Sequence, residues 1–142
     1  MMRVGRTLGL SALLILVCLA AGAEPRPDAE GCRDHPLLTR MKDFYIVGCR
    51  EEVFGTHQFL IEEGKTSVEG RYTFIEYYIQ DDAPQTSNLQ IIRNHTGALG
   101  KIGGVTRFED QYSGTVELVT ADKEVWIEIV AGGGARYELH II

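Results

Sequence analysis

The chain has 142 residues, with 14 basic and 20 acidic side chains and a formal net charge of −6. This acidity excludes the basic surface on which binding to nucleic acids or to anionic lipid depends, so we expect no nucleic-acid partner. The length predicts a single domain.

Residues 1–23 have the pattern of a cleavable secretory signal peptide. Arg3 and Arg6 precede an apolar run at 8–19, and Ala21-Gly22-Ala23 supplies small residues at the predicted cleavage site. The run is shorter than the roughly 20 residues of a membrane-spanning helix, so no transmembrane segment is expected in the mature chain. Removing two of the 14 basic residues leaves 12 against 20 acidic ones, a net charge of −8.

The mature chain begins with a polar segment and carries two cysteines. Residues 24–33 contain two prolines, a composition typical of a flexible leader. In an exported protein, Cys32 and Cys49 are predicted to form a disulfide that stabilises the fold by about 3 kcal/mol. A zinc site of Cys32, His35, Cys49 and His57 is an alternative, although its spacing matches no common ligand pattern. A nucleophilic cysteine with a histidine partner is a second alternative.

The first half of the domain reads as three strands. Residues 44–47 predict a short strand, Glu51-Glu52 a connection, Gly55 a turn and residues 57–61 a second strand. A turn at 62–65 leads into a long strand at 68–80, rich in aromatic and β-branched residues.

Both faces of the strand at 68–80 are largely apolar. Tyr72, Phe74 and Tyr78 alternate with Ile75, Tyr77 and Ile79 on the opposite face. Such a strand is expected inside a sheet, with other parts of the chain covering both of its sides.

One helix is predicted at residues 88–102, capped by Thr86 or Ser87 and ended by Gly103-Gly104. Its expected buried stripe is Leu89, Ile92, Leu99 and Ile102. We interpret Gly97 and Gly100 as positions that let the helix lie close against the sheet, at a cost of up to about 1 kcal/mol each in helix propensity.

The last third of the chain has the alternation of a β-meander. Strands are predicted at 105–110, 115–119, 125–129 and 136–142, with a turn at 121–123. In the final strand, Tyr137, Leu139 and Ile141 alternate with Arg136, Glu138 and His140, which predicts one buried and one wet face. The fold class is therefore α+β: a mostly antiparallel β-sheet with one main helix packed on a face.

No catalytic motif occurs in the sequence. Nucleophile elbows, phosphate-binding loops, dinucleotide fingerprints and zinc-protease signatures are absent, and the four histidines are scattered. We therefore predict no enzyme activity, no cofactor and no metal. One candidate binding face remains, the aromatic residues Tyr72, Tyr77, Tyr78 and Trp126.

Several segments together resemble the N-terminal region of bacterial outer-membrane proteins of the OmpA family. The resemblance covers nearly all of residues 34–142 and is carried by the segments DHPLL (34–38) with Arg40-Met41, FYI (44–46), VEG (68–70), IEYY (75–78), LQIIRN (89–94), IGG (102–104), KEVWIEI (123–129) and YELHII (137–142). In that family a short α+β domain of poorly understood role precedes a C-terminal domain that binds peptidoglycan.

The resemblance implies an exported, non-enzymatic envelope domain that acts as an accessory or interaction module in the periplasm or at the outer membrane. Other envelope proteins are its expected partners. This chain lacks the family's C-terminal domain and stops inside its last predicted strand, so peptidoglycan binding is not supported by this chain alone. We expect the single domain of residues 34–142 to be truncated at its C-terminus.

Two other functions compete with this interpretation. The first is a periplasmic small-molecule or peptide-binding protein that uses the aromatic sheet face. The second is a periplasmic hydrolase, which no motif supports.

Overall fold

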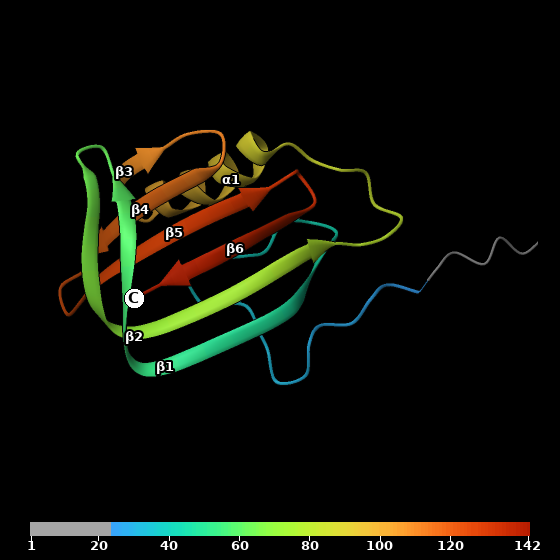
Figure 1. Cartoon of the computed structure of the whole chain (residues 1–142), viewed down its shortest axis with the longest axis horizontal. Coiled ribbons are helices and arrows are strands. Elements are labelled where there is room, and N and C mark those ends of the chain that lie inside the picture. Colours follow the sequence, from blue (N-terminus) through green and yellow to red (C-terminus); the bar gives the residue numbers. More distant parts are fainter. Residues whose placement is uncertain (1–23) are drawn as a thin grey trace, which may run out of the picture.

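The structure, a computed structural model, describes residues 24–142, which form one antiparallel sheet of six strands with one helix among these residues (Figure 1). The strands follow the order β1-β2-β6-β5-β4-β3 across the sheet. The predicted α+β fold with a mostly antiparallel sheet is confirmed, whereas the signal peptide at 1–23 lies outside the described residues. The elements are β1 (Phe44–Ile61), β2 (Gly64–Ile79), α1 (Asn88–Lys101), β3 (Val105–Glu109), β4 (Ser113–Val119), β5 (Glu124–Gly132) and β6 (Arg136–Ile141).

The two strands predicted at 44–47 and 57–61 are one continuous strand, β1. Its pairing with β2 shifts register between Ile46 and Gly48 and again between Glu52 and Gly55. The prediction of a connection and a turn here was wrong because these bulges bend the strand without ending it.

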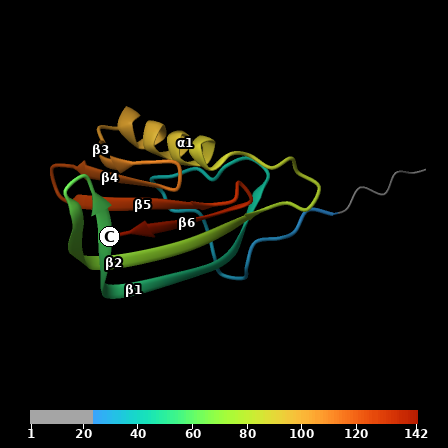
Figure 2. The ribbon, with the colours of Figure 1, turned by 45° about the horizontal axis from the view of Figure 1, so that its top comes forward.

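The β1–β2 hairpin curls over the sheet on the side opposite the helix (Figures 1 and 2). At its tip the Glu62 amide donates a hydrogen bond to the Arg107 carbonyl of β3, with 3.1 Å between nitrogen and oxygen. The end of the first strand thus reaches the far edge of the sheet and lies over β5, β4 and β3.

Helix α1 begins at the predicted cap. The Ser87 side chain accepts a hydrogen bond from the Gln90 amide at 3.1 Å, which satisfies one of the free donors of the first turn. The predicted buried stripe was partly wrong, because Ile102 lies beyond the last turn and is 52% exposed. The residues that α1 buries are Ile91, Ile92, His95, Thr96 and Leu99.

The glycines that bring helix and sheet together are not those of the helix. Gly97 and Gly100 are exposed, and a Cβ atom at either would meet no neighbour within 4 Å. Gly114 of β4 has this role instead, since a Cβ there would lie 2.8 Å from methyl carbons of Ile92 and Thr96. The structure therefore contradicts the interpretation of Gly97 and Gly100 as packing positions.

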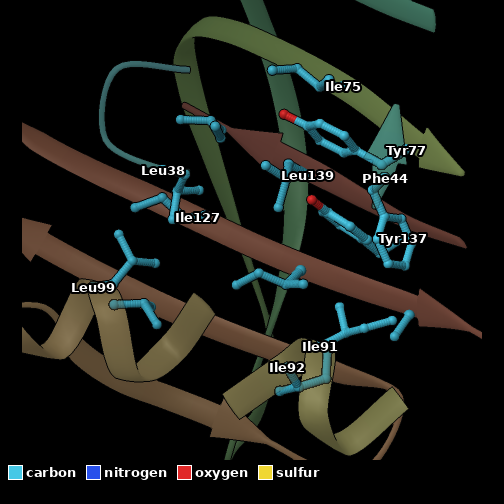
Figure 3. Packing of buried hydrophobic residues seen from close by; sticks show 14 of the residues in the cluster. Leu38, Phe44, Ile75, Tyr77, Ile91, Ile92, Leu99, Ile127, Tyr137 and Leu139 are labelled. Carbon is cyan, nitrogen blue, oxygen red and sulfur yellow. The ribbon is translucent and has the colours of Figure 1, made fainter. Parts of the chain in front are cut away.

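The main core lies between the sheet and two coverings. Helix α1 packs over β3, β4 and β5, and its Ile91, Ile92 and Leu99 point toward the sheet (Figure 3). The segment before β1 contributes Leu38 to the same core. Stacked rings of Tyr77 and Tyr137, with centroids 4.5 Å apart, lie where β2 meets β6.

Residues 24–33, predicted to be a flexible leader, are tied to the sheet. Asp28 accepts hydrogen bonds from the Ile46 amide and from the Arg40 guanidinium. The Ala29 amide donates to the Ile46 carbonyl at 2.8 Å. These hydrogen bonds hold residues 24–33 in place, and the polar composition of the segment does not predict them.

Candidate functional site

A cleft of about 760 Å³ opens on the helix side of the sheet, at the end that α1 leaves uncovered. Its floor includes Ile75, Val125 and Ile141, which face the main core. Its walls are residues 33–37 of the N-terminal segment, residues 68–71 of β2 and the start of β5. Its volume and mixed polar and apolar lining are those of a small-molecule site.

The N-terminal wall of the cleft is fixed at several points. The predicted disulfide between Cys32 and Cys49 is present, with Cα atoms 5.7 Å apart, and it attaches the start of this wall to β1. Asp34 accepts hydrogen bonds from the Arg40 guanidinium at 2.9 Å and from the Tyr77 hydroxyl at 2.8 Å. The wall is therefore held in position before any ligand binds.

The rim of the cleft carries charges of both signs. Among residues 24–142, no carboxylate lies within ion-pairing distance of Arg33 or Lys123, whereas Arg71 pairs with Glu51 at 3.1 Å. The pKa of His35 is lowered, first by burial and then by the positive charge of Lys123, with Arg71 adding a smaller effect. Asp34, Glu51, Glu69 and Glu124 also line the cleft, so its lining is mixed in charge, and Arg33 and Lys123 are the cations available to an anionic group of an amphipathic ligand.

The four aromatic residues predicted to form a binding face do not share one surface. Trp126 borders the cleft, but its ring packs against Phe59 of the hairpin, with centroids 5.7 Å apart, on the same side of the sheet as Tyr72, whereas Tyr77 is buried in the core. Tyr78 is 37% exposed and lies outside the cleft. Of the four, only Trp126 borders the candidate site.

The alternative zinc set of Cys32, His35, Cys49 and His57 does not assemble. Both cysteines are consumed by the disulfide, so neither offers the thiolate that a zinc site needs. His35 lines the cleft, whereas His57 lies on the curled hairpin over the other side of the sheet.

A second arrangement, which the sequence did not predict, lies between the curled hairpin and the sheet. We call His57, Glu128 and His140 the polar cluster; the side-chain ligand atoms of these three residues all lie within 4.8 Å of one another. The wet face predicted for the final strand is wrong here, because the hairpin leaves the His140 side chain only 15% exposed. Alternation did place Glu128 and His140 on the outer face of their strands, but nothing local predicts that His57 folds over them.

No family model matches this chain, and no curated protein shows a significant match to it. Within residues 24–142, no helix combines the length and apolar character needed to cross a membrane. The functional interpretation therefore depends on the structure itself, which is a disulfide-linked α+β domain with a preformed cleft. The resemblance to OmpA-family N-terminal regions stays a prediction.

Proposed function

We propose that this protein is an exported, non-enzymatic binding module of the cell envelope, and that its cleft holds a small amphipathic molecule or short peptide with an anionic group. The observation that carries the proposal is the cleft itself, with Ile75, Val125 and Ile141 in its floor and Arg33 and Lys123 at its rim. The apolar part of a ligand would be removed from water on the floor. Its anionic group would lie near the rim cations.

The surroundings of the cleft also support the proposal. The disulfide and the Asp34 hydrogen bonds fix one wall, so little conformational freedom is lost when a ligand binds. A disulfide suits an oxidising compartment, which agrees with the export predicted from residues 1–23. The envelope location and the accessory role rest on that predicted leader and on the OmpA-like segments.

The chain carries its own reporter for this site. Trp126 is the only tryptophan in the sequence and borders the cleft, although its ring packs against Phe59 on the hairpin side. We propose titrating the protein with 1-anilinonaphthalene-8-sulfonate, an amphipathic anion, and measuring energy transfer from Trp126 together with the heat of binding. The expected result is saturable binding with one probe per chain.

Two variants test whether the cleft is the binding site. Thr73→Tyr adds a bulky ring to the lining, and Lys123→Glu reverses a rim charge; each should weaken probe binding about tenfold or more. The matched controls are Thr106→Tyr on β3 and Lys101→Glu at the end of α1, both exposed and outside the cleft, which should bind as the parent does. Equal binding by all four variants, or no saturable binding, would contradict the proposal.

The non-enzymatic part of the proposal has a separate test. Turnover of envelope substrates by the purified protein, abolished by Thr73→Tyr but not by Thr106→Tyr, would show that the cleft is an active site.

A further inference from the structure

The polar cluster joins three separate parts of the chain in one partly enclosed layer. Glu128 of β5 and His140 of β6 are directly opposite each other in the strand register, and His57 reaches them from the curled hairpin. Glu128 is 5% exposed, while the side chains of His57 and His140 are 21% and 15% exposed. The cluster is separate from the cleft, since none of its three residues lines that cavity.

The carboxylate of the cluster is oriented by hydrogen bonds from the hairpin. One Glu128 oxygen accepts a bond from the Leu60 amide at 3.3 Å, and the other lies 2.7 Å from His57 Nε2. A buried carboxylate without such partners would be strongly destabilising. The hairpin therefore both covers Glu128 and directs its second oxygen toward the histidines.

The second imidazole is also positioned by a neighbour. The Tyr72 hydroxyl lies 2.8 Å from His140 Nδ1, which leaves Nε2 as the ring nitrogen that can meet an ion, with Glu138 Oε2 3.5 Å away from it. Partners of this kind set the tautomer and orientation of metal-binding histidines. The hydroxyl of Thr115, which is opposite Glu128 in the register, is buried and has no hydrogen-bond partner among the described residues. The layer thus contains a buried hydroxyl for which the surrounding side chains provide no hydrogen-bond partner.

We propose that His57, Glu128 and His140 form a binding site for one divalent transition-metal ion, with Zn²⁺ as the preferred occupant. Two imidazole nitrogens and one carboxylate oxygen are a donor set that zinc uses in proteins, and imidazole favours transition metals over magnesium or calcium. The ligand atoms lie within 4.8 Å of one another, and Glu128 Oε2 is 2.7 Å from His57 Nε2, so the three side chains must rearrange around a bound ion.

Binding an ion requires one defined movement. The rings of His57 and His140 are stacked, with centroids 4.2 Å apart and an angle of 11° between their planes, so their nitrogen lone pairs lie in nearly parallel planes that do not meet at one ion. The ring of His57 must turn for both lone pairs to meet one ion, and it is the more exposed of the two. The bound ion would attach the curled hairpin to β5 and β6, a role independent of ligand binding in the cleft.

The direct test is a titration of the purified, EDTA-treated and then chelator-free protein with ZnCl₂ by isothermal calorimetry at pH 7.5. The expected result is saturable binding of one ion per chain. MgCl₂ should give no binding under the same conditions. No saturable zinc binding up to about 1 mM, or equal binding of magnesium, would overturn the proposal.

Variants assign the ligands. His57→Gln and His140→Gln should each lower zinc affinity at least tenfold, whereas the matched control His35→Gln, in the cleft, should leave it unchanged. Tyr72→Phe removes the hydroxyl beside His140 and should lower affinity about tenfold, the usual range for such supporting groups. Zinc binding that persists in both His57→Gln and His140→Gln would overturn the assignment.

A measurement on the unaltered protein avoids reliance on variants that fold poorly. In NMR spectra of the imidazole nitrogens, zinc should shift the ring signals of His57 and His140 and leave those of His35 and His95 in place. Shifts confined to His35 would overturn the proposal. The result is independent of probe binding in the cleft, so this proposal and the proposed function can fail separately.

Discussion

The two faces of the sheet are closed by different kinds of side chain, although both belong to the same strands. On the helix side, β5 presents Ile127 and Ile129, which are completely buried in an apolar core. On the hairpin side, the same strand presents Trp126 and Glu128, and Glu128 contacts His57. Phe59 is also completely buried on the hairpin side, but there it lies beside polar groups whose hydrogen bonds join particular atoms, whereas apolar burial alone is non-directional.

The helix side mainly stabilises the fold, whereas the hairpin side carries the side chains that can bind an ion. The helix side removes large aliphatic side chains from water, the main favourable contribution to folding. The hairpin side partly encloses titratable groups that stabilise the fold only while their partners are in place. We therefore expect substitutions on the helix side to change the free energy of unfolding most, and those on the hairpin side to change zinc binding.

The largest contrast is expected between adjacent residues of β5. Ile129→Ala leaves a cavity in the main core and should lower the free energy of unfolding by about 3–4 kcal/mol. Val130→Ala, on the hairpin side and only half-buried, should lower it by about 1 kcal/mol. Urea denaturation followed by circular dichroism measures both values. Equal losses would show that the two faces contribute similarly.

His95 is the exception on the helix side, because it is a fully buried imidazole with no hydrogen-bond partner for either nitrogen among the described residues. Burial lowers its pKa from 6.5 to about 4. Between these values the unfolded chain binds the proton and the folded chain does not, so stability should fall by about 3 kcal/mol as the pH drops from 6.5 to 4.

The variant His95→Leu isolates this contribution from that of His140, whose pKa is also lowered to about 4 by burial and by His57. Urea denaturation at several pH values measures how steeply the free energy of unfolding falls as the pH is lowered. In His95→Leu this fall should be smaller, by the contribution of about one proton bound on unfolding. An unchanged slope would mean that His95 is protonated in the folded state.

The third expected effect concerns how closely α1 approaches the sheet. Gly114→Ala places a methyl group 2.8 Å from carbons of Ile92 and Thr96, so the helix must shift, at a cost of about 2 kcal/mol. Gly97→Ala, on the open side of the helix, should instead stabilise the protein by up to about 1 kcal/mol. Thermal unfolding of both variants tests the pair, and a stabilised Gly114→Ala variant would contradict the packing described for α1.

Features that depend on local patterns could be predicted from the sequence. Alternation identified Tyr137, Leu139 and Ile141 as core residues, and Ser87 was one of the two predicted helix caps. The disulfide followed from the predicted export and the number of cysteines. Each of these features depends on a few neighbouring residues or on the compartment, so predicting it does not require knowing which distant segments pair.

Features that depend on distant pairing could not be predicted in this way. The polar cluster joins His57 to Glu128, 71 positions away, through bulges in β1 that a turn signal at Gly55 also fits. The cleft needs the N-terminal segment, whose polar composition suggested flexibility, to be tied down by Asp28 and the disulfide. The glycine at the helix–sheet contact was predicted wrongly, because a glycine's position in a helix does not show whether the helix or the sheet provides the close approach.

The smallest effect is expected at Thr115, the unsatisfied hydroxyl of the hairpin side. Its side chain is completely buried, and its oxygen has no hydrogen-bond partner among residues 24–142. Thr115→Val replaces that hydroxyl by a methyl group of similar size and should raise the free energy of unfolding by about 1 kcal/mol in EDTA. Val116→Thr, the reverse change on the neighbouring helix-side position, should lower it by about 1–3 kcal/mol, since it buries a hydroxyl among aliphatic side chains. If Thr115→Val is destabilising instead, the hydroxyl has a hydrogen-bond partner, and the hairpin side is more completely satisfied than its side chains alone indicate.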